Sequence, residues 1–142
     1  MPFLTEIDLR NDKADETNWI VLSELRYQSR RDNDVVIIVP KGFVSDLSSV
    51  PRIPLVYSLF GGRGNGPAIV HDWCYRTGCR AKGAADLLFL DGMKDIGLSW
   101  WIREMMYIGV KYGGYWTYKG YVKDRAEGRS PWEIRDVDPF IQ

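Results

Sequence analysis

The order of local patterns along the chain constrains the fold more than any other feature. Up to about residue 45 the chain is rich in β-branched and aromatic residues, as at residues 19–22 and 35–39, which is typical of strands. After Pro67, apolar residues recur at the spacing of three and four that is typical of helices. Strands first and helices afterwards predict an α+β fold and not alternating α/β. The length, 142 residues, is that of one ordinary domain, so residues 1–142 are expected to form a single domain.

Short antiparallel strands are expected in an N-terminal β part that covers about residues 1–58. The polar residues 30–34 include turn formers, and they separate the apolar runs at 19–22 and 35–39 as a hairpin connection would. Residues 43–45 are expected to form another short strand after the glycine at position 42.

A three-helix portion is expected over residues 67–113, after a glycine-rich loop at 60–67. The three helices are predicted at residues 67–78, 82–95 and 98–112. Gly78 and Gly97 are expected to end the first two of them. Residues 114–142 are aromatic and then charged, and they are expected to form an extended C-terminal arm.

The charge balance excludes partners that are held by a large electrostatic field. Nineteen basic residues match nineteen acidic ones, so no nucleic-acid partner is expected. The longest apolar run, residues 35–39, is much shorter than the roughly 20 residues that span a bilayer, so no transmembrane segment is expected. Residues 1–6 have neither a basic nor an apolar signal region, so no signal peptide is expected.

The single histidine, His71, restricts the chemistry that the chain can perform. Zinc centres built on two or three histidines are excluded within one chain. The two cysteines, Cys74 and Cys79, cannot supply a four-thiolate zinc site or a disulfide framework. A reduced pair is favoured, and a disulfide that closes the small loop between them is the open alternative.

His71 has three neighbours that suggest a site. Asp72 lies about 100° around the predicted helix from His71, so the two side chains would point apart. This arrangement suits two separate roles, with the imidazole as a base and the carboxylate as a cation ligand. Tyr75 follows four residues after His71 and shares its face. Asp86 stands within an apolar stretch of the next helix, and a buried carboxylate needs a partner. The short connection 79–81 therefore predicts a hydrogen bond between His71 and Asp86 across antiparallel helices, which would also fit a purely structural histidine.

A first resemblance concerns the two helices around this histidine. Their sequences resemble the signature of secreted and viral-capsid phospholipase A2 domains at residues 71–75, 85–89 and Met93. The resemblance implies that His71 deprotonates the attacking water and that Asp86 orients the imidazole. It also implies that Tyr75 donates a hydrogen bond to Asp86.

The same resemblance implies a Ca²⁺ site and therefore a metal-assisted ester hydrolase. Asp72 would bind the ion, and the glycine-rich loop would add backbone oxygens at Gly62 and Gly64. The chain departs from the secreted enzymes at Ala85, where they place a cysteine, and it lacks their disulfide scaffold. The loop is open to two other interpretations, an anion-binding nest or a hinge.

A wider resemblance is to a small uncharacterised family of tailed-phage and prophage proteins, a domain of unknown function, at residues 40–52, 71–72 and 85–89. It implies a phage setting without an established reaction, and it adds Asp46 to the site residues as a further candidate metal ligand. Asp46 follows an expected strand and begins an irregular loop, where site residues are common. The alternative for Asp46 is a local turn cap bonded to the backbone of Ser48 or Ser49.

The segment 100–121 holds eight aromatic residues, more than a helix can bury on one side. Exposed tyrosine and tryptophan favour interfaces, so this segment is expected to contact other phage structural proteins or a second copy, or transiently a membrane. An aromatic core is the alternative.

Together these features predict a phage-associated protein, in a virion or the host cytoplasm, with a phospholipase-A2-like hydrolase site acting on envelope lipid or another ester. The alternative is a structural tail or virion component without activity.

Overall fold

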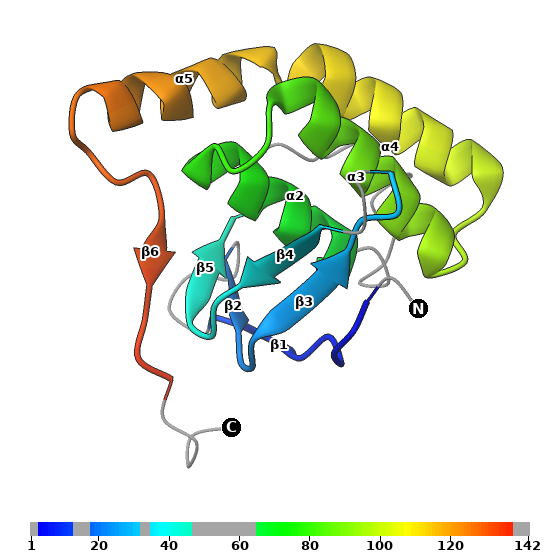
Figure 1. Ribbon diagram of the computed structural model, residues 1–142, viewed down its shortest axis with the longest axis horizontal. Coiled ribbons are helices and arrows are strands. Elements are labelled where there is room, and N and C mark those ends of the chain that lie inside the picture. Colours follow the sequence, from blue (N-terminus) through cyan, green and yellow to red (C-terminus); the bar gives the residue numbers. More distant parts are fainter. Residues whose placement is uncertain (1–2, 13–17, 32–34, 47–64, 138–142) are drawn as a thin grey trace.

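The computed structural model describes residues 3–12, 18–31, 35–46 and 65–137. Its fold is α+β, as predicted, with short strands first and helices afterwards (Figure 1). The strands are β1 (Leu9–Asn11), β2 (Trp19–Val21), β3 (Leu25–Gln28), β4 (Val36–Val39), β5 (Phe43–Ser45) and β6 (Glu133–Ile134). The helices are α2 (Asn65–Thr77), α3 (Lys82–Asp95), α4 (Trp100–Gly113) and α5 (Tyr115–Ala126).

The strands form two antiparallel sheets, one with the order β1-β2-β5-β6 and one made of β3 and β4. The expected hairpin before β4 is present, but its first strand is β3 and not residues 19–22, which form β2 and pair with β1 and β5. β3 escaped notice because it has no apolar run. Its residues alternate, with Leu25 and Tyr27 buried and Arg26 exposed, as in a strand that covers a core on one face only.

The first two predicted helices are present with nearly the predicted bounds. α2 begins two residues before Pro67 and ends at Thr77, and Gly78 follows with φ of +71°. α3 has the predicted bounds, and Gly97 beyond it has φ of +82°. Both glycines adopt the left-handed conformation that commonly terminates helices.

A fourth helix, α5, replaces part of the expected C-terminal arm. Residues 115–126 are helical and not extended, although many of them are charged. The helix is stabilised by docking: Tyr118 and Tyr121 pack against the core, and Arg125 donates to the backbone oxygens of Tyr75 and Arg76 at 3.0 and 2.7 Å. Tertiary contacts therefore outweigh the polar composition of the segment.

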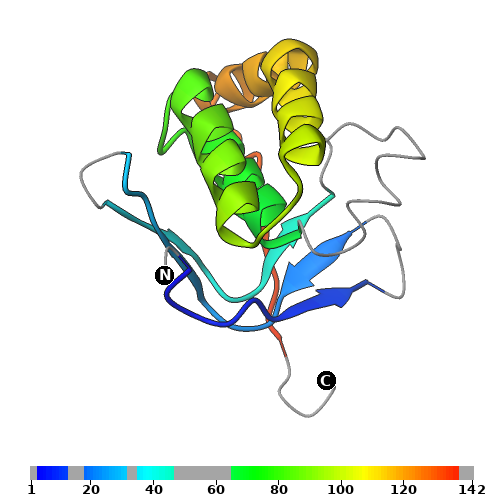
Figure 2. The same cartoon turned by 90° about the vertical axis from the view of Figure 1, so that its right-hand side faces the viewer.

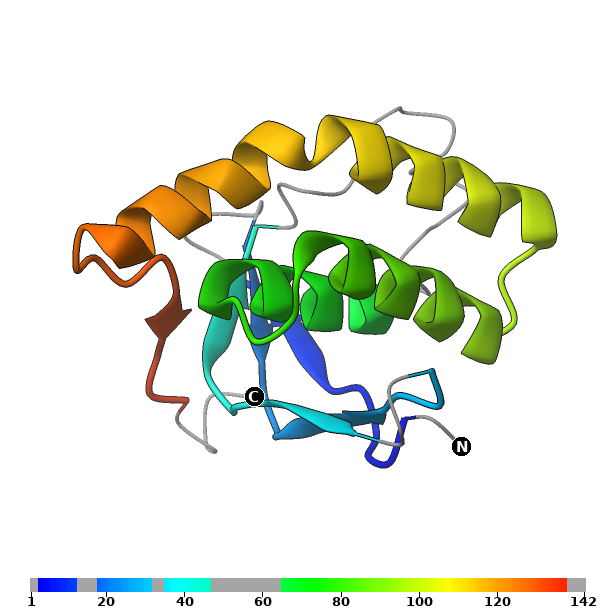
Figure 3. The same cartoon turned by 45° about the horizontal axis from the view of Figure 1, so that its top comes forward.

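α2 is the central element of the fold. It contacts β4 and β5 on one side and α3 and α5 on the other. Figure 2 shows the strands as a curved layer beneath the helices, and Figure 3 shows α4 and α5 as one bent arc across α2 and α3. Among the described residues, no helix is long and apolar enough to cross a membrane.

The core lies between this layer of strands and the helices. The largest fully buried side chains include Tyr27, Phe43, Ile69, His71, Tyr75, Phe89, Met93 and Met106. His71 and Tyr75 are thus core residues as well as candidate site residues.

Candidate active site

The antiparallel packing of α2 and α3 brings His71 to Asp86. Pro67 near the start of α2 lies against Gly92 near the end of α3, where a Cβ would come within 3.0 Å of the proline ring. Further along α2, Nε2 of His71 lies 2.7 Å from Oδ1 of Asp86. This distance confirms the predicted hydrogen bond. The bond forms because two helices joined by a short connection return alongside each other.

Asp86 accepts two further hydrogen bonds. The hydroxyl of Tyr75 donates to Oδ1 at 2.6 Å, as the phospholipase resemblance implied. Nζ of Lys82 donates to Oδ2 at 2.7 Å, and it also donates to the backbone oxygens of Val110 and Lys111 at 3.1 and 2.9 Å. Sequence reasoning missed Lys82, although its position four residues before Asp86 on one helix is a standard signal for such a pair.

These donors decide the charge state of Asp86. Burial raises the pKa of a carboxyl, but here the hydrogen bonds from His71, Lys82 and Tyr75 outweigh burial, and the pKa of Asp86 lies below its ordinary value. Burial together with the bond to Asp86 raises the pKa of Tyr75, so this hydroxyl stays protonated and donates. Asp86 is therefore a carboxylate at neutral pH, and it favours the imidazole tautomer that donates from Nε2.

The imidazole of His71 is enclosed by rings. Its centroid lies 4.1 Å from that of Tyr75 and 5.0 Å from that of Phe89, and the residue is 0% exposed. In the tautomer that Asp86 favours, the lone pair is on Nδ1. Chemically, this arrangement can orient a base and stabilise its protonated form, as in carboxylate–histidine pairs generally.

Asp72 belongs to a different cluster, on another side of α2. Its Oδ2 accepts from the hydroxyl of Ser45 at 2.5 Å, and both of its oxygens lie 3.0 Å from Nε of Arg76. Arg76 also donates to Asp46 at 2.9 Å and to the backbone oxygen of Pro131 at 2.9 Å. Arg76 therefore binds both carboxylates. These hydrogen bonds are separate from the His71–Asp86 bond, although the wider resemblance placed Asp46 with His71, Asp72 and Asp86.

This cluster does not fit a Ca²⁺ ion. Burial raises the pKa of Asp72 despite the opposing effects of Arg76 and Ser45, so its charged form is disfavoured there. Arg76 already supplies the positive charge that a cation would bring. Among the described residues no group of three or more His, Cys, Asp or Glu side chains could hold a metal ion, and Gly62 and Gly64 lie outside the described residues.

Sequence reasoning also missed Arg76. Its position four residues after Asp72 was an available signal, but its bond to Asp46 spans 30 residues and depends on how β5 lies against α2.

A cavity of about 320 Å³ lies elsewhere in the molecule, between β3 and α3, and is lined by Tyr27, Arg30, Arg31, Asp91, Lys94 and Asp95. Side chains that line this cavity bind one another: Arg31 donates two hydrogen bonds of 2.8 and 2.9 Å to Asp91, and Tyr27 donates to Asp95 at 3.0 Å. It does not include His71.

Comparison with models of known protein families shows which family the chain belongs to. A family model described as "Protein of unknown function (DUF1353)" matches residues 19–110, more than half of the chain. The chain belongs to this family. The DUF1353 region contains His71, Tyr75, Lys82 and Asp86, as well as the Asp46–Arg76–Asp72 cluster. The expectation of an uncharacterised family is confirmed. No curated protein and no solved structure matches the chain significantly.

Proposed function

We propose that this DUF1353 protein is a phage-associated hydrolase that uses His71 as a general base on an ester, with envelope lipid as the first candidate substrate. The observation that carries the proposal is the geometry at Asp86, whose Oδ1 lies 2.7 Å from Nε2 of His71 and accepts from Tyr75 at 2.6 Å. The phage setting is supported by the resemblance of residues 40–52 to phage and prophage proteins.

In the proposed reaction, the imidazole of His71 takes a proton from water as the water oxygen attacks the ester carbonyl. Asp86 stabilises the imidazolium that forms, and Tyr75 and Lys82 position Asp86. The proton then passes to the leaving alcohol, and the imidazole returns to its neutral form. The proposal assigns no step to Ca²⁺, because the guanidinium of Arg76 already binds the side chains of Asp72 and Asp46.

The test compares the wild type with His71→Gln and Asp86→Asn on phospholipid vesicles and on simple nitrophenyl esters, with calcium and with chelator. Glutamine keeps a neutral donor toward Asp86 but cannot accept the proton, so we expect turnover to fall by about 100-fold or more. Asp91→Asn is the matched control, because it makes the same change on α3 in the half-exposed Arg31–Asp91 pair. Equal turnover in the wild type and His71→Gln would refute the assignment.

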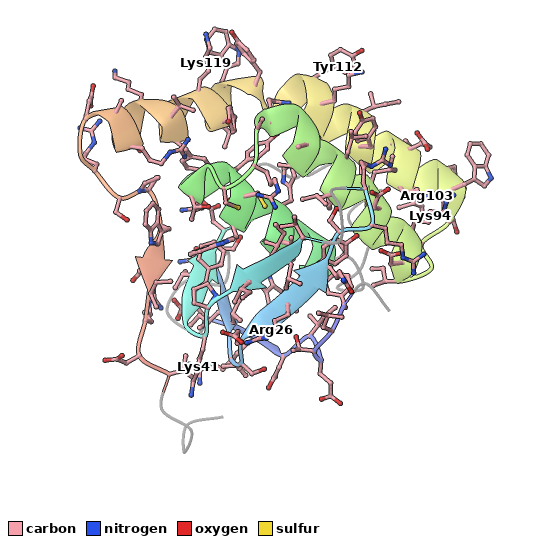
Figure 4. All side chains as sticks on the ribbon, in the orientation of Figure 1. Arg26, Lys41, Lys94, Arg103, Tyr112 and Lys119 are labelled. Carbon is pink, nitrogen blue, oxygen red and sulfur yellow. The ribbon has the colours of Figure 1, made fainter. Side chains whose placement is uncertain are left out.

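A second candidate is a structural tail or virion component in which His71 only fastens α2 to α3. Two observations favour it. His71 and Asp86 are 0% and 2% exposed, whereas α4 and α5 carry the most exposed aromatic side chains among the described residues, such as Trp116 at 77% and Tyr112 at 72%. Figure 4 shows Tyr112 and Lys119 pointing away from the body of the molecule.

For this candidate we propose that α4 and α5 contact other phage structural proteins or a second copy, within a virion. Turnover would then be absent in every variant, and His71→Gln would change only the melting temperature. A double variant, Tyr112→Ser with Trp116→Ser, should weaken assembly as measured by sedimentation velocity, while it leaves the melting temperature of the monomer unchanged because both side chains are exposed.

A further inference from the structure

The two cysteines form a close pair at the end of α2. Cys74 lies on the helix and is fully buried, whereas Cys79 lies beyond its end and is exposed. Gly78, with φ of +71°, turns the chain so that Cys79 comes back over the helix. The two Sγ atoms are 3.4 Å apart, and both residues are free thiols.

We propose that Cys79 and Cys74 are a peroxide-reactive thiol pair, in which Cys79 is oxidised first and Cys74 then closes an intramolecular disulfide. The difference in exposure sets the order, because an oxidant in solution reaches Cys79 and not Cys74. The distance makes the second step local, since the sulfur atoms need to move only from 3.4 Å to about 2.05 Å.

The surroundings of Cys79 favour its reactive form. The hydrogen bond with the Cys74 sulfur outweighs the effect of burial and, with smaller contributions from Thr77 and Arg80, lowers the pKa of Cys79 to about 6. The thiolate is the nucleophilic form of cysteine, so Cys79 would be mostly reactive at neutral pH. The hydrogen bond to Cys79 and burial raise the pKa of Cys74, which therefore stays a thiol until it resolves the intermediate.

The chemistry balances with hydrogen peroxide as the oxidant. The Cys79 thiolate attacks one peroxide oxygen, the O–O bond breaks, and the products are a sulfenic acid and hydroxide, which takes up a proton to become water. Sγ of Cys74 then attacks Sγ of Cys79, the S–O bond breaks, and the sulfenic oxygen leaves as a second water. Two thiols lose two electrons in total, and one peroxide is reduced to two waters.

The pair lies next to the candidate active site. Cys74 precedes Tyr75, the donor to Asp86, and Arg125 binds the backbone oxygens of Tyr75 and Arg76 from the other side. Oxidation would therefore fix the last turn of α2 at the end that carries Tyr75. This inference does not depend on the proposed hydrolase, because it concerns only the thiols.

The experiment treats the reduced full chain with hydrogen peroxide and then maps the products by mass spectrometry. We expect the wild type to lose both thiols together, to form a monomeric species with a 74–79 disulfide, and to recover both thiols with dithiothreitol. In Cys74→Ser, Cys79 should accumulate a sulfenic acid that dimedone traps. In Cys79→Ser, thiol loss should be at least about tenfold slower than in the wild type.

Several results would overturn the proposal. The first is that the wild-type thiols persist at a peroxide concentration that gives a dimedone adduct in Cys74→Ser. The second is that disulfides form only between chains. The third is that Cys79→Ser and the wild type lose thiols at equal rates. Because Cys74 is buried, Cys74→Ala serves as a second variant if serine prevents folding, and the mapping of the wild-type disulfide needs no variant. Oxidation at the exposed Met105, which adds oxygen without consuming thiols, controls for the peroxide dose.

Discussion

Replacing Asp86 by asparagine tests the hydrogen-bond network at its centre. The carboxylate is 2% exposed and accepts from His71, Tyr75 and Lys82 at 2.7, 2.6 and 2.7 Å. Asparagine has nearly the same shape, and its oxygen can still accept from His71 and Tyr75. Its amide would face the ammonium of Lys82, so one charged bond is lost and two donors oppose each other.

The expected cost follows from that mismatch. Loss of a hydrogen bond to a charged group costs about 1.5–3 kcal/mol, and removing one partner of a buried ion pair costs about 3–5 kcal/mol. Lys82 keeps its bonds to the oxygens of Val110 and Lys111 and is partly exposed, which reduces the penalty. We therefore expect Asp86→Asn to lower the free energy of unfolding by about 2–4 kcal/mol.

The assay is urea unfolding at pH 7, followed by circular dichroism and by tryptophan fluorescence. For a chain of this size, a loss of 2–4 kcal/mol should also lower the melting temperature by roughly 5–15 °C. Asp91→Asn breaks the exposed pair with Arg31 and should cost less than about 1 kcal/mol. If the two variants are equally stable, Asp86 is not the acceptor at the centre of a buried network, and the assignment of His71 loses its basis.

Three further predictions follow from the same contacts. The pKa of Asp86 in the folded state lies below its unfolded value of about 3.9. Its carboxylate therefore stabilises the fold above that pH, and this stabilisation is lost as the pH falls through the folded pKa. In urea titrations, acid should thus destabilise the wild type more than Asp86→Asn. The pKa of Asp72 is raised in the folded state, so the contribution of Asp72 to folding stability falls as the pH rises through that pKa. Asp72→Asn should therefore cost less stability at pH 7 than Asp86→Asn. Gly42→Ala should lower the stability measured in melting experiments by about 2 kcal/mol or more, because φ is +91° and a Cβ would lie 2.0 Å from the backbone oxygen of Arg135. Gly120→Ala, in open space on α5, should instead raise the stability by up to about 1 kcal/mol.

Local patterns were sufficient to predict the part of the site that depends on two neighbouring helices. The bounds of α3 and the stop at Gly78 follow from periodicity and from glycine conformation. The bond between His71 and Asp86 then follows from the short connection between the helices. These features depend on residues that are close in sequence, where spacing and turn chemistry carry most of the information.

The features that could not be predicted depend on long-range docking. Arg76 binds Asp46 only because β5 packs beside α2, and Lys82 binds the last carbonyls of α4 only because that helix crosses above α3. The same holds for α5, whose polar sequence gives little sign of the face that packs on the core. Spacing of four on one helix makes Arg76 available to Asp72 and Lys82 to Asp86, but neither pair was predicted, because spacing alone does not show which available partner binds.

Charge balance around Asp86 offers the sharpest separation between a catalytic and a structural His71. Lys82 neutralises the carboxylate, so the site is already balanced while the imidazole is neutral. His71→Gln preserves that neutrality and a donor toward Asp86. If His71 only fastens the two helices, His71→Gln should change the melting temperature and there is no turnover to lose. Loss of turnover in a variant that remains as stable as the wild type belongs instead to proton transfer.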